Sequence, residues 1–156
     1  MEHLITDRTS ADVERWRQLH DKGFQKMSAA EKAEWLGFMK GRYTSEDMNR
    51  VESAVKAVSE ALTELGYKHP TLSTKTNWTA QDCPTRDDMV RYFGNVAALR
   101  EVIPVLRTTP AAPTVANRLN YARANDLEQI LVDVDRVAKN IPQAWFAAGE
   151  IFSGEV

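Results

Sequence analysis

The chain has 156 residues, and its 20 Lys and Arg nearly balance its 22 Asp and Glu. This length suits one domain that buries a substantial core without metals or disulfides. The balanced charge, without a basic cluster, argues against nucleic-acid binding. No apolar stretch approaches the roughly 20 residues that span a bilayer, and the first residues lack the features of a secretory signal. The single cysteine, Cys83, excludes an internal disulfide. We therefore expect one domain over residues 1–156, made in the cytoplasm, with no nucleic-acid or membrane partner.

Helix starts are marked by Ser or Thr followed three residues later by an acid. The hydroxyl can accept a hydrogen bond from a free amide of the first turn, and the acid can bind back to the cap residue. Because Glu is the standard partner in this motif, only one of the five pairs is expected to form the full capping box, namely Ser28 with Glu31. The five pairs are Thr9 with Asp12, Ser28 with Glu31, Thr44 with Asp47, Thr79 with Asp82, and Thr85 with Asp88.

Apolar residues at helical spacing predict three helices, over about 10–22, 29–40 and 45–65, each followed by a glycine that can end it. The third is the clearest, because its apolar residues step by 3, 4, 3, 4 and 3 positions: Met48, Val51, Val55, Val58, Leu62 and Leu65.

Residues 67–78 interrupt the helical pattern with a proline and several threonines, which predicts an ordered extended connector able to pair as an edge strand. Trp78, at its end, is interpreted either as a core residue or as an interface anchor. A fourth helix is expected from Arg86 to Ile103. Gly94 lies inside it and suggests the close approach of another backbone.

Three prolines in residues 104–117 predict a loop. A last helix is expected over about 121–140, with Pro142 kinking it or starting a new turn in which Trp145 packs on the core. Beyond Gly149, three apolar residues are interpreted as a short extended arm: Ile151, Phe152 and Val156. The expected fold is therefore an all-α bundle of about four to five helices, with an extended connector and a short extended C-terminal arm.

No pattern in the sequence predicts catalysis, a cofactor or a metal site. His3, His20 and His69 are not spaced as ligands or as a general base would be. We interpret the acids at 126, 128, 133 and 135 as solvated helix surface. Three asparagines inside predicted helices either fix register through buried contacts or are simply exposed: Asn49, Asn95 and Asn125.

Five segments in this order resemble a family of small structural proteins encoded in the tail-module region of phages and prophages of Gram-positive gut bacteria. The resemblance covers residues 4–156, and departs from the family at Asn120, where a Thr cap is common, and at Pro142. It implies a virion component and carries no catalytic residues. The segments are "LITDRTSADV", "YTSEDMNRVESAV", "KTNWTAQDCPTRDDMVRYFGNVAALR", "ANDLEQILVDVDR" and "AWFAAGEIFSGEV".

We therefore expect a non-enzymatic structural protein of a phage-like tail or baseplate. Its expected partners are copies of itself, forming a homo-oligomer, or other tail proteins, and its expected location is the host cytoplasm during assembly and then the virion. The expected interface residues are Trp78, Ile151, Phe152 and Val156. The alternative is an adaptor or regulatory helical module that binds a host or phage protein through an apolar helix face, the 48–65 seam.

Overall fold

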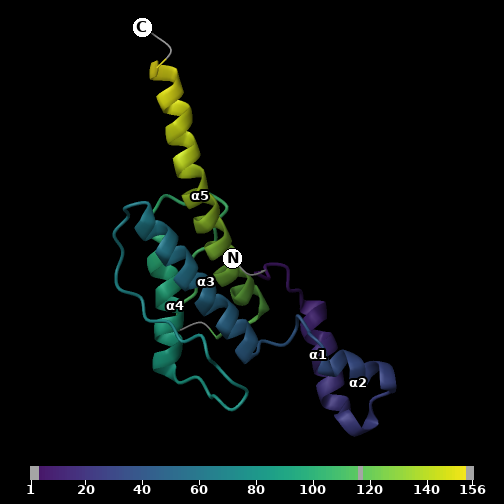
Figure 1. Ribbon diagram of the computed structural model, residues 1–156. Coiled ribbons are helices and arrows are strands. Elements are labelled where there is room, and N and C mark those ends of the chain that lie inside the picture. The colour runs from purple at the N-terminus through teal and green to yellow at the C-terminus, as the bar shows by residue number, and fades with distance from the viewer. Residues whose placement is uncertain (1–3, 116–117, 154–156) are drawn as a thin grey trace.

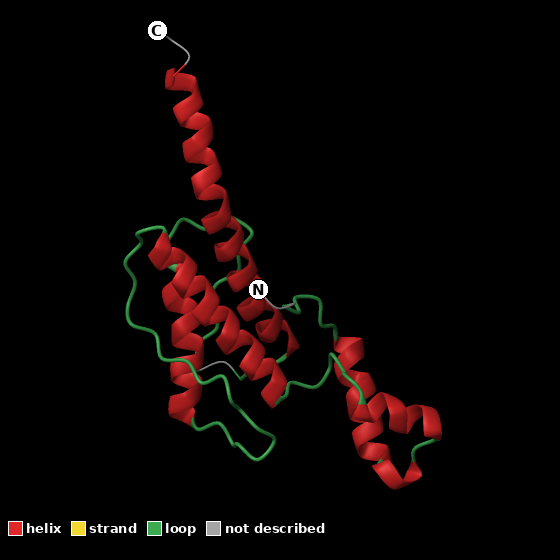
Figure 2. Cartoon of the chain, viewed as in Figure 1, coloured by secondary structure: helices red, strands yellow, loops and turns green. Residues whose placement is uncertain are grey.

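The computed structural model describes the backbone of residues 4–115 and 118–153, and side chains within these ranges as far as Trp145. The described residues form helices joined by loops, and no strand is present among them (Figure 2). The all-α prediction is confirmed. The elements are α1 (Ser10–Lys22), the short 3-10 helix η1 (Phe24–Lys26), α2 (Ala29–Leu36), α3 (Ser45–Glu64), α4 (Arg86–Arg100) and α5 (Tyr121–Ser153).

The predicted capping pairs open the first four α-helices. Glu31 closes the box at Ser28, as expected. The expectation that Asp is too short to close it was wrong: an Asp12 carboxylate oxygen accepts from the Thr9 amide at 2.7 Å, and Asp12 donates its own amide to the Thr9 hydroxyl at 3.2 Å. At Thr79 the Asp82 carboxylate also accepts from the backbone amide, but a turn follows there rather than a helix.

The main core lies where α3, α4 and α5 pack against one another (Figure 1). The predicted seam of α3 faces this core, and α4 contributes Tyr92, Phe93, Val96 and Leu99. Each fully buried side chain of this size stabilises the fold by roughly 1.5–3 kcal/mol before conformational entropy is counted. The seam that the adaptor hypothesis needs on the surface is therefore part of the core, apart from Leu65, which packs against its edge.

The first two helices form a smaller unit beside the bundle (Figure 1). Its separate apolar cluster consists of Leu19, Met27 and Met39, with Trp16 and Trp35 half-buried against it. The chain crosses α1 closely at Gly41, where a Cβ atom would fall 2.0 Å from the carbonyl oxygen of Asp12. The close backbone approach predicted for Gly94 is found at Gly41 instead, since a Cβ at Gly94 would meet open space.

Residues 67–78 form the predicted extended connector, but pairing as an edge strand was a wrong prediction for it. Side-chain amides from the helices provide the hydrogen bonds that a neighbouring strand would otherwise give to the connector. Asn49 donates to the carbonyl of Trp78 at 2.9 Å and accepts from its amide at 2.7 Å. Asn95 donates to the carbonyl of Ser73 at 2.7 Å. These asparagines therefore fix the position of the connector, the first of the two interpretations left open by the sequence.

Helix α5 differs most from expectation. It begins at the Asn120 cap, whose side-chain oxygen accepts from the Arg123 amide at 2.9 Å. It then runs through Pro142 to Ser153, so the extended arm predicted after Gly149 is wrong as far as residue 153. The helix formers around Ala144 and Ala148 favour continuation and outweigh the roughly 1 kcal/mol cost of a glycine. Val156 lies outside the described residues.

Candidate functional site

Four charged side chains from three parts of the chain meet in the interior, and we call them the ion-pair cluster: Arg8, Asp47, Arg50 and Glu128. Arg8 donates to Glu128 at 2.7 Å and to Asp47 at 3.0 Å. Arg50 donates to Asp47 at 2.5 Å and to Glu128 at 3.1 Å. Two positive and two negative groups make the cluster neutral, which offsets the cost of removing them from water.

Glu128 is 0 % exposed, so its interpretation as solvated helix surface was wrong. Its second carboxylate oxygen accepts from the backbone amide of Ile5 at 2.6 Å. One helical turn before Glu128 on α5, Asn125 donates to the carbonyl of Arg8 and accepts from its amide. The cluster therefore ties the N-terminal segment to α3 and α5, and neither of its carboxylates is left free for acid–base chemistry.

The other acids of α5 divide between interior and surface. Asp133 is buried, which also contradicts the solvated-surface interpretation, and it accepts from the Thr109 hydroxyl at 2.8 Å. It thereby anchors the proline-rich loop onto α5. Asp135 is half-buried and pairs with Lys139 at 2.6 Å. Neither contact leaves a carboxylate aimed at an open site.

Trp78 lies in the main core, with 5 % of its surface exposed. Its predicted role as an exposed interface anchor is therefore wrong. Beneath the same connector, Glu52 pairs with Arg91 at 2.7 Å. Burial raises the pKa of the Glu52 carboxyl, against the lowering effect of Arg91. The Glu52–Arg91 pair and the buried Trp78 side chain hold the connector against the helices.

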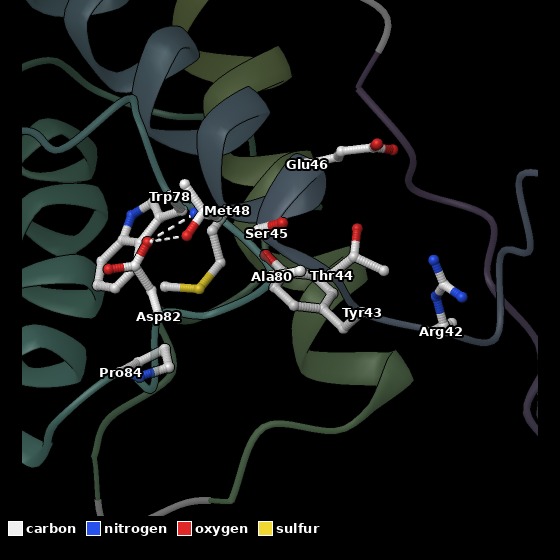
Figure 3. Close-up of a pocket in the computed structure, with 11 residues that line it drawn as sticks. Arg42, Tyr43, Thr44, Ser45, Glu46, Met48, Trp78, Ala80, Asp82 and Pro84 are labelled. Carbon is white, nitrogen blue, oxygen red and sulfur yellow. Dashed lines mark hydrogen bonds between the residues drawn. The ribbon is translucent and has the colours of Figure 1, made fainter.

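A cleft of about 510 Å³ lies between the start of α3 and residues 78–84 (Figure 3). The acid in its wall is already paired, since Asp82 accepts from Lys75 at 2.9 Å and from the Thr79 amide at 2.6 Å. Figure 3 places Arg42 and Glu46 well apart from Asp82, so the charged groups do not converge on one point. The cleft offers no arrangement of nucleophile, base and orienting group.

Within the part of the chain that the structure describes, no cluster of three or more His, Cys, Asp or Glu is arranged to hold a metal ion. None of the helices described combines the length and the apolar character that crossing a membrane requires. Cys83 is exposed and forms no disulfide.

The most unusual surface is the far end of α5, residues 141–153, which we call the projecting segment. Figure 1 shows it extending beyond the ends of α3 and α4. Trp145 is 60 % exposed, so its predicted packing on the core was wrong. Glu150 is the one charged residue in the segment. An apolar helix end with an exposed tryptophan is typical of a protein-binding surface.

The apolar seam of α5 continues from the core into the projecting segment without a break. Its residues step by 4, 3, 4, 3, 4, 3 and 4 positions. The first four are buried in the bundle, and Ile141 is half-buried at its end. The remaining three lie on the helix beyond the bundle. The full seam is Leu127, Leu131, Val134, Ala138, Ile141, Trp145, Ala148 and Phe152.

Of the predicted interface residues, Ile151 and Phe152 lie on the helical backbone of the projecting segment, Trp78 is in the core and Val156 is outside the described residues. Sequence reasoning missed Trp145 as a surface residue. The unbroken 3-and-4 spacing through Pro142 could have indicated that the helix continues, but no signal in the sequence shows that it extends past the three-helix core. No protein-family model matches the chain, and neither the curated proteins nor the solved structures include a significant match.

Proposed function

We propose that this chain is a structural component of a phage-like tail or baseplate, and that it acts through protein–protein contacts without catalysis. The observation that carries the proposal is Trp145, which is 60 % exposed on the projecting segment, where the helix continues the spacing of a buried seam. Exposed apolar surface of this kind is costly in water and is retained where a partner covers it.

The resemblance of the sequence to small tail-region proteins supplies the phage context. A three-helix core that interior ion pairs tie to the N-terminal segment suits a part that holds a position in an assembly. The proposal places the protein in the host cytoplasm during assembly and in the tail of the virion afterwards.

The alternative, an adaptor module, remains a proposal with a changed binding face. The 48–65 seam is buried, so an adaptor would have to bind its target through the projecting segment as well. The two functions then differ in where the protein ends up. A tail component stays in the finished particle, whereas an adaptor is left in the lysate.

The test is the protein content of purified particles. Particles from the producing strain are banded on a density gradient and analysed by peptide mass spectrometry, and the same is done for a strain with the gene deleted. A tail component gives the chain at a fixed ratio to the known tail proteins, and deletion gives defective particles. Normal, infectious particles that lack the chain would overturn the proposal.

A further inference from the structure

We propose that the first two helices form an arm that swings on a two-stranded hinge and closes a cavity against the start of α5. We call this arm the α1–α2 unit, residues 9–41. The inference does not depend on the proposed function, since it concerns how two parts of one chain move relative to each other. Its starting point is that the two parts have separate interiors: among the described residues, none belongs both to the apolar cluster of the α1–α2 unit and to the main core.

The contact between the α1–α2 unit and the bundle is small. α1 packs on α2 and η1, and α3, α4 and α5 pack on one another, whereas packing between these two groups of described helices is marginal (Figure 1). Lys40 of the unit pairs with Asp7 of the N-terminal segment at 2.5 Å, but the Asp7 side chain is 70 % exposed, and an exposed ion pair contributes little. Two parts joined by so small an interface are expected to move relative to each other.

The first strand of the hinge is the link between Arg8 and Thr9. Arg8 is fixed to the bundle, since its backbone exchanges two hydrogen bonds with Asn125 and its guanidinium pairs with Glu128 at 2.7 Å. Thr9 is fixed to the α1–α2 unit, because it caps α1 in a reciprocal pair of hydrogen bonds with Asp12. Rotation at this link therefore leaves both sets of contacts intact.

The second strand of the hinge is the link between Arg42 and Tyr43. On the side of the α1–α2 unit, the Arg42 amide donates to the Met39 carbonyl at 3.1 Å, and Gly41 packs so closely on α1 that a Cβ atom would fall 2.0 Å from a carbonyl oxygen of that helix. On the side of the bundle, the Tyr43 hydroxyl lies 2.6 Å from the Tyr92 hydroxyl. The two links join the same two parts, so together they restrict the motion to a swing about one axis.

An open cavity of about 290 Å³ beside the hinge gives the swing its direction. Val13 and Gly41 line it from the α1–α2 unit, and Leu119, Tyr121 and Ala124 line it from the segment that opens α5. Tyr121 is 37 % exposed. Closing the cavity brings apolar walls together and removes their area from water, which favours the closed arrangement. Because Val13 lies one helical turn from the hinge, a small rotation is enough to close it.

Residual dipolar couplings of the backbone amides, measured on the full chain, test the swing. We expect α3 and α4 to fit one alignment tensor, because they share a core. α1 and α2 should fit a second tensor of smaller magnitude, since motion at the hinge averages their couplings. The pair α3 and α4 is the internal control for the quality of the fit. A single tensor of one magnitude for the α1–α2 unit and the bundle would overturn the inference.

A disulfide across the cavity tests the closure, in a Cys83→Ser background. The pair Val13→Cys and Tyr121→Cys should link on oxidation, because closure brings the two Cα atoms within the roughly 7 Å that a disulfide requires. The oxidised protein should then fit one alignment tensor, and the same protein after reduction should again need two. Gln18→Cys with Tyr121→Cys is the matched control, since Gln18 is exposed on α1 and does not line the cavity.

Three results of the disulfide experiment would overturn the closure. They are a Val13–Tyr121 pair that does not link, a linked protein that still needs two tensors, and a control pair that links as fast as the Val13–Tyr121 pair. None of them bears on whether the chain is found in particles, so the inference and the proposed function are tested separately.

Discussion

Asn125 and Arg8 exchange two hydrogen bonds, 117 residues apart in the sequence: the Asn125 side chain accepts from the Arg8 amide at 3.0 Å and donates to the Arg8 carbonyl at 2.9 Å. A helix side chain thus provides the pairing that a neighbouring strand would give. Asn49 does the same for Trp78. The 67–78 connector, which was predicted to pair as an edge strand, and the N-terminal segment are both held in this way without forming a sheet.

Replacing Asn125 by Ala should lower the free energy of unfolding by about 2 kcal/mol, because the amide and carbonyl of Arg8 lose their partners in a part-buried site. Asn140→Ala is the matched control, since Asn140 is exposed on the same helix. Urea denaturation followed by circular dichroism measures both variants. Equal losses in the two would contradict the role given to Asn125.

Replacing Glu128 by Gln should cost about 3–5 kcal/mol, because Arg8 and Arg50 then lack a full set of negative partners in the interior. Asp135→Asn on the same helix breaks only the partly exposed pair with Lys139 and should cost roughly 1 kcal/mol or less. Thermal and urea unfolding of the two variants gives the comparison. A Glu128→Gln protein as stable as Asp135→Asn would show that the ion-pair cluster does not hold the fold.

Alanine substitutions at two glycines, Gly41 and Gly94, should have opposite effects on stability. Gly41→Ala places a Cβ atom 2.0 Å from the Asp12 carbonyl oxygen and 2.7 Å from the Val13 nitrogen, both backbone atoms, so the crossing must move apart. Gly94→Ala adds a methyl group in open space within α4 and should stabilise the protein by up to roughly 1 kcal/mol. We expect Gly41→Ala to unfold at clearly lower urea concentration than wild type, and Gly94→Ala at higher. A neutral Gly41→Ala would contradict the close crossing.

The Glu31 cap of α2 should contribute to the loss of folding stability at acidic pH. The bond from Lys22 and those from Ser28 lower the pKa of Glu31 from 4.5 to about 2. Because the folded pKa lies below the unfolded one, this stabilisation is complete above about pH 4.5 and is lost as the pH falls through about 2. Gln can keep the capping geometry without the charge.

Melting temperatures between pH 2 and 5 measure this effect. Glu31→Gln should show a shallower fall on acidification than wild type, whereas Glu64→Gln, at an exposed position of α3, should follow the wild-type curve. A Glu31→Gln curve parallel to wild type across the range would exclude this contribution from the cap.

What the sequence could predict was local. The Thr9 and Thr85 caps and the α3 seam follow from residues within a few positions of one another, and the structure has them where they were expected. Glu128 could not be placed from its neighbours, because its partner Arg8 lies 120 residues away. The extended arm was inferred from Gly149 and from the spacing of the apolar residues beyond it, and the good helix formers around Gly149 outweighed that signal as far as residue 153.

The exposure of the candidate surface could not be predicted, because it depends on where the helices that pack against α5 end. Trp145 has the spacing of a core residue, and it is exposed because α3 and α4 end before reaching it. Periodicity gives the face of a helix on which a residue lies, but it does not give the length of the helices that pack against that face.

The central claim is that the protein is built into a particle through the projecting segment, and incorporation of variants tests it most directly. A strain lacking the gene is supplied in turn with wild type, Trp145→Glu and Gln143→Glu, and the chain is quantified in gradient-purified particles. We predict that wild type and Gln143→Glu are incorporated equally and that Trp145→Glu is lost from the particles while remaining folded in the lysate. Incorporation of Trp145→Glu at the wild-type level would contradict the account.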